Sequence, residues 1–160
     1  MLATKLHIPP TRPTLVLRSR LMDRLSAGLH RKLTLVSAPA GFGKTTLVAK
    51  WVRDVGKDDR RESRAAYQIA WLSLDQDDND LNRFLTYFIT ALDRCAQEEL
   101  FLEKPLSMLQ SPQQPPTETL LTALINAIAA VPNEFILVLD DYHLVEAQPV
   151  HTALNFLLEN

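Results

Sequence analysis

The residues Ser37-Ala38-Pro39-Ala40-Gly41-Phe42-Gly43-Lys44-Thr45-Thr46 directly follow the apolar run Leu33-Thr34-Leu35-Val36. This stretch predicts an apolar strand over 33–37, a tight glycine turn, and a helix over 44–53. A phosphate-binding loop needs this order, because glycines let backbone N–H groups point at an anion while the positive end of the helix faces the same charge. Residues 38–45 therefore predict a Walker A loop for the phosphates of a nucleotide.

Each part of this loop has an expected role. Lys44 is expected to reach the outer phosphates and to take part in catalysis, and the Thr45 hydroxyl to bind Mg²⁺. Ala38 stands where the usual G-x-x-x-x-G-K-[ST] pattern has its first glycine, at a position that leaves the strand and can accept alanine. The alternative interpretation is a glycine-rich turn with an exposed lysine. The residues expected to bind the cofactor are Ala38, Pro39, Ala40, Gly41, Phe42, Gly43, Lys44, Thr45 and Thr46.

Composition restricts the classes of function. The chain has 160 residues, of which 46% are apolar and 22% charged, as in an ordinary globular domain. Its net charge of −2 provides no basic surface for nucleic acid or an anionic membrane, so an element that reads DNA is expected outside this chain. A single cysteine, Cys95, excludes an internal disulfide, and no apolar run reaches membrane-spanning length. We therefore expect a soluble, cytoplasmic protein.

Apolar periodicity predicts an α/β fold in which helices flank a parallel sheet. Further strands are expected over 69–74 and 135–139, and further helices are expected to begin at Ser19, at Asn79 or Asp80, at Thr117 and near Pro149. Residues 104–116, with four prolines, are expected to form a surface connector. Residues 1–32 are interpreted as a segment that leads into the nucleotide pocket, and residues 33–160 as a partial P-loop NTPase domain.

The strand over 135–139 ends in Asp140 and Asp141, which makes 135–141 a candidate Walker B motif. The carboxyl end of such a strand emerges beside a phosphate loop, so Asp140 is expected to bind the Mg²⁺ that Thr45 also contacts. Asp141 is expected to orient or deprotonate the attacking water. The alternative is an acid pair that caps the turn after a strand. A strand and two helices separate the two motifs, which favours the additional-strand class of P-loop NTPases, and the sequence lacks a guanine-reading motif, which favours ATP.

Five segments occur together in a characteristic order: Pro9-Pro10, Val16-Leu17-Arg18-Ser19-Arg20-Leu21, the 38–46 loop, Trp71-Leu72-Ser73-Leu74-Asp75, and Leu139-Asp140-Asp141-Tyr142-His143. With them the chain resembles the N-terminal ATPase domain of the large ATP-dependent LuxR-type transcription regulators, relatives of the maltose-regulon activator in the STAND class. The resemblance implies an ATP-dependent switch that self-associates and activates transcription. It also implies that Arg18 helps to enclose the nucleotide, with a surface arginine as the alternative.

The resemblance further implies that a sensor strand, a helical sensor region and a C-terminal helix-turn-helix follow in family members. The domain is therefore expected to be incomplete at its C-terminus, to bind DNA only through a region outside this chain, and to hydrolyse ATP slowly and only in the full-length context. Two alternatives remain: a truncated, non-catalytic remnant that pairs with a full-length relative, and a free-standing small ATPase or small-molecule kinase.

Several other residues invite a functional interpretation. His143 lies in the segment that follows the acid pair and could approach the γ-phosphate, although a loop histidine bonded to backbone is the simpler expectation. Asp75 begins an acidic stretch that superficially resembles a calcium loop. Asp80 and Thr86 occupy the positions that require glycine and glutamate, so a helix-capping loop is expected instead. Cys95 is expected to be buried filler.

Overall fold

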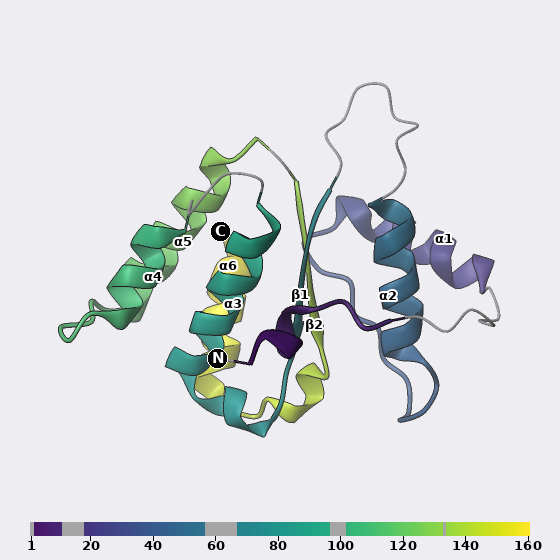
Figure 1. Cartoon of the computed structure of the whole chain (residues 1–160), viewed down its shortest axis with the longest axis horizontal. Coiled ribbons are helices and arrows are strands. Elements are labelled where there is room, and N and C mark those ends of the chain that lie inside the picture. Colours follow the sequence, from purple (N-terminus) through teal and green to yellow (C-terminus); the bar gives the residue numbers. More distant parts are fainter. Residues whose placement is uncertain (1, 11–17, 57–66, 97–101, 133) are drawn as a thin grey trace. The chain divides into compact units, whose positions relative to one another are not determined.

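The computed structural model describes residues 2–10, 18–56, 67–96, 102–132 and 134–160 (Figure 1). The chain divides into two compact units, and each is described by itself. The larger unit comprises residues 1–7 and 67–160, and the smaller unit comprises residues 8–66.

The larger unit is built on a parallel pair of strands, β1 (Gln68–Ser73) and β2 (Phe135–Asp140). Their register runs from Gln68 opposite Phe135 to Ser73 opposite Asp140, so both carboxyl ends lie at one edge of the sheet. The pairing extends one residue further, because Leu74 N–H donates to the Asp140 carbonyl at 2.9 Å. Both strands lie within one residue of their predicted bounds, which confirms the α/β fold with a short parallel sheet.

Helices cover one side of this sheet (Figure 1). They are α3 (Leu81–Cys95), α4 (Glu103–Gln110), α5 (Thr117–Ala130) and α6 (Gln148–Glu159). α3 packs on β1, and both α4 and α6 contact α3 and α5. The core between them is fully buried at Leu72, Phe84, Ile89, Leu124 and Val150. In α3 the buried apolar positions 84, 85, 88, 89 and 92 recur at helical spacing, so burial of one apolar face accounts for the formation of this helix.

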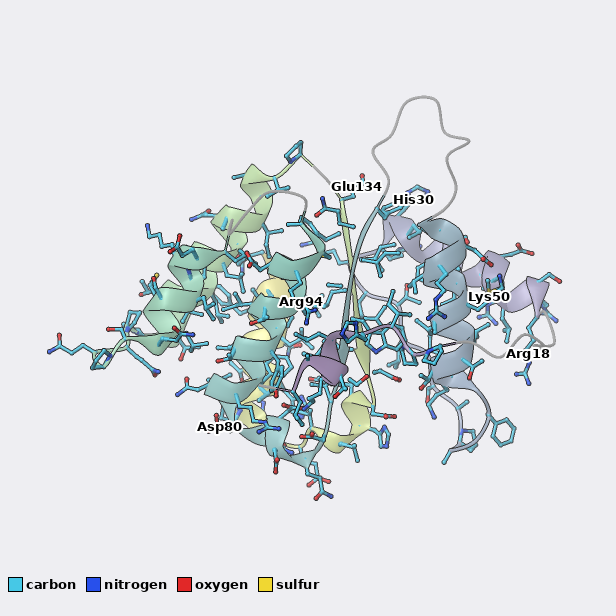
Figure 2. The ribbon with its side chains drawn as sticks, in the orientation of Figure 1. Arg18, His30, Lys50, Asp80, Arg94 and Glu134 are labelled. Carbon is cyan, nitrogen blue, oxygen red and sulfur yellow. The ribbon has the colours of Figure 1, made fainter. Side chains whose placement is uncertain are left out.

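The ends of these helices follow from local chemistry. Asp80, at the start of α3 (Figure 2), accepts a hydrogen bond from Arg83 N–H at 2.8 Å and so caps the helix, as one of the two predicted residues. Pro149 lies in the first turn of α6, as expected, where its missing N–H removes no hydrogen bond of the helix.

The predicted surface connector over 104–116 is wrong in its first half, where α4 forms. Pro105 lies in the first turn of α4, so it does not interrupt the hydrogen bonding of the helix. Pro105 and Leu109 are buried, and their packing stabilises a helix that the proline-rich composition concealed.

The smaller unit contains α1 (Ser19–Ala27), a 3-10 turn η2 (Gly28–His30) and α2 (Lys44–Val55). Trp51 of α2 is buried, and its Nε1–H donates to Ser26 Oγ of α1 at 3.0 Å. The expected N-cap at Ser19 is wrong by one residue. Arg18 occupies the cap without a side-chain cap bond, and Ser19 already has a place in the first turn.

The strand expected over 33–37 is not formed in the described structure. These residues carry no strand hydrogen bonding, and the side chains of Leu33 and Leu35 are 63% and 82% exposed. A strand requires a neighbour for its N–H and C=O groups, and within the described residues β1 and β2 pair only with each other. The apolar pattern was therefore not sufficient to define a strand here.

The described helices include none that is long and apolar enough to cross a lipid bilayer.

Candidate functional site

The phosphate loop, residues 38–46 of the smaller unit, adopts a backbone that glycine makes possible. Gly41 and Gly43 have φ angles of +81° and +79°, in the left-handed region that residues with a Cβ avoid. A Cβ at either position would meet no atom within 4 Å, so the backbone angle alone explains the need for glycine. Gly43 is also the N-cap of α2, and its carbonyl accepts from Leu47 N–H at 2.9 Å. The predicted order of glycine turn and helix is confirmed.

Lys44, the first residue of α2, folds back over this loop. Its Nζ donates to the Ala38 carbonyl at 2.8 Å and to the Pro39 carbonyl at 3.3 Å. The contact at position 38 uses a backbone oxygen, which any residue supplies, so alanine in place of the usual glycine leaves this contact intact. Lys44 is also the first residue of α2, a helix of 12 residues whose N-terminal N–H groups favour an anion.

Thr45 and Thr46 follow Lys44 in the first turn of α2, and both are half-buried. The loop residues 38–43 are exposed, including the ring of Phe42 at 61%. This part of the smaller unit therefore offers backbone donors, a lysine and two hydroxyl groups at one accessible helix end.

The acid pair lies at the carboxyl edge of the sheet in the larger unit. Asp140 is the last residue of β2, and Asp141 has a φ of +58°, the single positive value for a residue other than glycine in the part of the chain that is described. Asp141 N–H donates to Asp140 Oδ1 at 3.2 Å, and Asp141 Oδ1 lies 3.9 Å from Nδ1 of the exposed His143. Backbone angles of this kind concentrate at functional sites.

The phosphate loop belongs to the smaller unit, whereas Asp140 and Asp141 belong to the larger one. The convergence of Lys44 and Asp140 on one metal-bound triphosphate stays a prediction. Arg18 lies exposed at the N-cap of α1, in the same unit as the phosphate loop (Figure 2), and its role toward the nucleotide also stays a prediction.

The acidic loop, residues 75–80, lies directly after β1 and forms a helix-capping structure as expected. Asp75 and Asp78 make a capping box around the 3-10 turn η3 (Gln76–Asn79). The side chain of Asp78 is fully buried and is bound by Lys5 Nζ and, at 3.3 Å, by Arg83 Nε. Cations of the protein itself therefore satisfy this carboxylate, which accounts for the acidic cluster without a calcium ion.

The sequence did not predict that Lys5 binds the carboxylates of Asp75 and Asp78. Lys5 belongs to the 3-10 turn η1 (Ala3–Leu6), which packs against β1, and it is only 6% exposed. Its Nζ also lies 3.0 Å from Asp75 Oδ2 and 4.8 Å from the centre of the Tyr87 ring. The hydrogen bond from Lys5 is the main reason that the pKa of Asp75 lies below its ordinary value. An isolated lysine near a chain end carries no periodic signal that could have revealed this contact.

Cys95 is half-buried at the end of α3, and burial raises the pKa of its thiol to about 11. A thiol that stays protonated is a poor nucleophile, which agrees with the expectation of a structural cysteine.

The chain is similar over its whole length to known transcription regulators, although no family model matches it. It is 33% identical over 165 residues to the HTH-type transcriptional regulator MalT of Cronobacter sakazakii and 32% identical over 160 residues to the MalT regulator of Yersinia pestis. Both alignments cover 100% of this chain but 16% of the relative, so the chain spans about a sixth of their length. These homologues confirm the resemblance that the motifs indicated, which is to the N-terminal domain of MalT-like, LuxR-type regulators.

Proposed function

We propose that this chain is the ATP-binding module of a transcription regulator, with Mg²⁺ as the metal. The observation that carries the proposal is the phosphate loop: two left-handed glycines lead into α2 while Lys44 is held over the carbonyls of residues 38 and 39. The backbone amides at this helix end favour a phosphate group, and Lys44 adds the positive charge that the outer phosphates require.

The donor chemistry fits Mg²⁺ as well. This ion prefers hard oxygen ligands, and the hydroxyl of Thr45 and the carboxylate of Asp140 are such ligands. Bound Mg²⁺ would neutralise charge that develops on the phosphates. In this proposal backbone N–H groups within residues 38–46, where Pro39 has none, bind the phosphates, Arg18 helps to enclose the nucleotide, and Asp141 holds the attacking water in place.

The proposal that this module acts as a switch is based on the similarity to the MalT regulators. They are named transcription regulators, and they extend well beyond the length that matches this chain. We therefore propose that ATP binding here controls self-association or pairing with a full-length relative in the cytoplasm. Contact with DNA would belong to another region of such a protein, and slow ATP hydrolysis would require the full-length context.

The test is a calorimetric titration of the chain with ATP in the presence of Mg²⁺. Replacement of Lys44 by alanine removes a charged hydrogen-bond donor, so we expect affinity to fall at least about tenfold. Lys50→Ala is the matched control, since Lys50 lies on the same helix and pairs with Asp54 at the surface at 2.6 Å. We expect the control to change affinity less than about twofold. Equal affinities for the wild type and Lys44→Ala would contradict the proposal, and a preference for GTP would overturn the choice of ATP.

A further inference from the structure

Asn79, the last residue of η3, joins the acidic loop to the segment that follows the acid pair. Its Oδ1 accepts from the N–H groups of Glu146 and Ala147, both at 2.7 Å. Its Nδ2 donates to the Leu144 carbonyl at 3.0 Å and to the Gln76 carbonyl at 2.9 Å. One half-buried side chain thus makes three bonds to residues more than sixty positions away and one within its own loop.

The chemistry of these bonds requires a carboxamide. Two backbone N–H groups need an acceptor, and two carbonyls need donors, which asparagine alone provides at this side-chain length. Aspartate would keep the acceptor but lose both donors, and it would bring a negative charge to the carbonyls of Gln76 and Leu144. Alanine would leave the N–H groups of residues 146 and 147 without this partner.

The segment that Asn79 binds is directly connected to Asp140 and Asp141. Leu144 N–H donates to the Asp141 carbonyl at 3.0 Å within the 3-10 turn η4 (Tyr142–Leu144). At its other end, Asp140 is fixed by β2 and by the bond from Leu74 N–H. Because only one tight turn separates these two anchors, the bonds from Asn79 restrict the backbone of Asp141, which is held at its unfavourable positive φ.

We propose that Asn79 is a positioning residue for the Asp140 and Asp141 carboxylates. Asn79 acts through the backbone of residues 144–147 and does not contact the nucleotide. The proposal rests on the proposed function, since it assigns these carboxylates to Mg²⁺ and to the attacking water. Groups behind metal ligands are known to affect metal affinity strongly, because they fix ligand orientation.

The first part of the test needs no nucleotide. Amide hydrogen exchange at residues 146 and 147 would be measured in the wild type, Asn79→Ala, Asn79→Asp and the control Asn82→Ala, whose residue is exposed on the first turn of α3. We expect exchange in Asn79→Ala to be at least about fivefold faster at these two amides. Asn79→Asp should retain most of the protection from exchange, because a carboxylate oxygen still accepts the hydrogen bonds of these two N–H groups. Asn82→Ala should exchange at the same rates as the wild type. Unchanged exchange in Asn79→Ala would overturn the proposal.

The second part measures how much Mg²⁺ increases the affinity for ATP. In Asn79→Ala this increase should fall about tenfold, and in Asn79→Asp it should fall less, because the bonds to residues 146 and 147 remain, whereas ATP affinity without Mg²⁺ should equal that of the wild type in both variants. A parallel loss of affinity with and without Mg²⁺ would indicate a merely structural role and contradict the proposal. If the wild type bound no ATP at all, the proposed function would fail, and the role of Asn79 toward Mg²⁺ with it. The exchange data would still decide whether Asn79 fixes the segment.

Discussion

The acid pair and the phosphate loop are held in place by different means. The acid pair in the larger unit stands at the end of a paired strand, next to a core in which Phe84 and Leu72 are 0% exposed. The phosphate loop in the smaller unit follows a segment that pairs with no strand among the described residues and in which Leu35 is 82% exposed, and its own Phe42 is 61% exposed. The acids depend on tertiary packing and side-chain hydrogen bonds, whereas the loop depends on the local conformation of two glycines and one lysine.

This difference has a consequence for substitutions. Changes in the core or in the buried ion pairs should unfold the larger unit, because many groups there share one packed arrangement. Changes in the phosphate loop should leave stability nearly unchanged unless they oppose the left-handed backbone. Three pairs of variants test this contrast, and they are ordered here by the size of the expected effect.

The largest loss of stability is expected for Phe84→Ala, and Phe42→Ala is its comparison in the phosphate loop. Phe84 is fully buried in the core and packs against Phe88 with a ring-centre distance of 5.7 Å. Its truncation should lower the free energy of unfolding by about 4 kcal/mol, because a large cavity remains. Phe42→Ala should change it by less than about 0.5 kcal/mol, as at most exposed positions. Urea unfolding followed by circular dichroism measures both, and equal losses would remove the contrast between the units.

A smaller loss is expected when the buried carboxylate of Asp78 is neutralised. In Asp78→Asn the cations Lys5 and Arg83 lose part of their pairing, so we expect about 3 kcal/mol less stability. Asp77→Asn is the matched control, because its side chain is 75% exposed and lies 3.4 Å from Arg83 Nη2. That surface pair should contribute less than about 1 kcal/mol. The same urea unfolding assay measures both variants. If Asp78→Asn were as stable as the wild type, the ion pairs of Asp78 with Lys5 and Arg83 would not stabilise the acidic loop.

The smallest loss of stability is expected for changes in the backbone conformation of the phosphate loop. Gly43→Ala should cost about 1–2 kcal/mol, since alanine is unfavourable at a φ of +79°. Gly43→Asn should cost clearly less, because asparagine tolerates the left-handed region and space for a side chain is open. Thermal unfolding of the whole chain, followed by tryptophan fluorescence, to which the buried Trp51 of α2 contributes, provides the measurement. If both variants lost the same stability, side-chain packing rather than φ would be the cause.

Features encoded within short stretches were predictable from the sequence. Helical spacing predicted α3 and α5, continuous apolar runs predicted β1 and β2, and the glycines predicted the turn before α2. The proline-rich composition of residues 104–116 gave a wrong prediction at α4. Pro105 lies in the first turn, where it does not disrupt the helix, and tertiary packing stabilises the rest.

Features that depend on distant partners were not predictable. Residues 33–37 have a strand-like pattern but no pairing neighbour in the described structure. Lys5 contacts Asp78, and Asn79 binds residues 144–147, across sequence separations that periodicity does not encode. The candidate site was therefore predictable as motifs, while the bonds that position the acid pair emerged only from the fold.

The central proposal is that the phosphate loop and Asp140 bind the same ATP and its metal ion. Mn²⁺, which accepts the same oxygen ligands as Mg²⁺, broadens nearby amide resonances, so a titration of the chain with Mn²⁺ and ATP tests the claim directly. We expect the resonances of Thr45 and of Asp140 to broaden together in the wild type, and neither to broaden when ATP is omitted at the same Mn²⁺ concentration. Broadening at one of these two residues without the other would contradict the account.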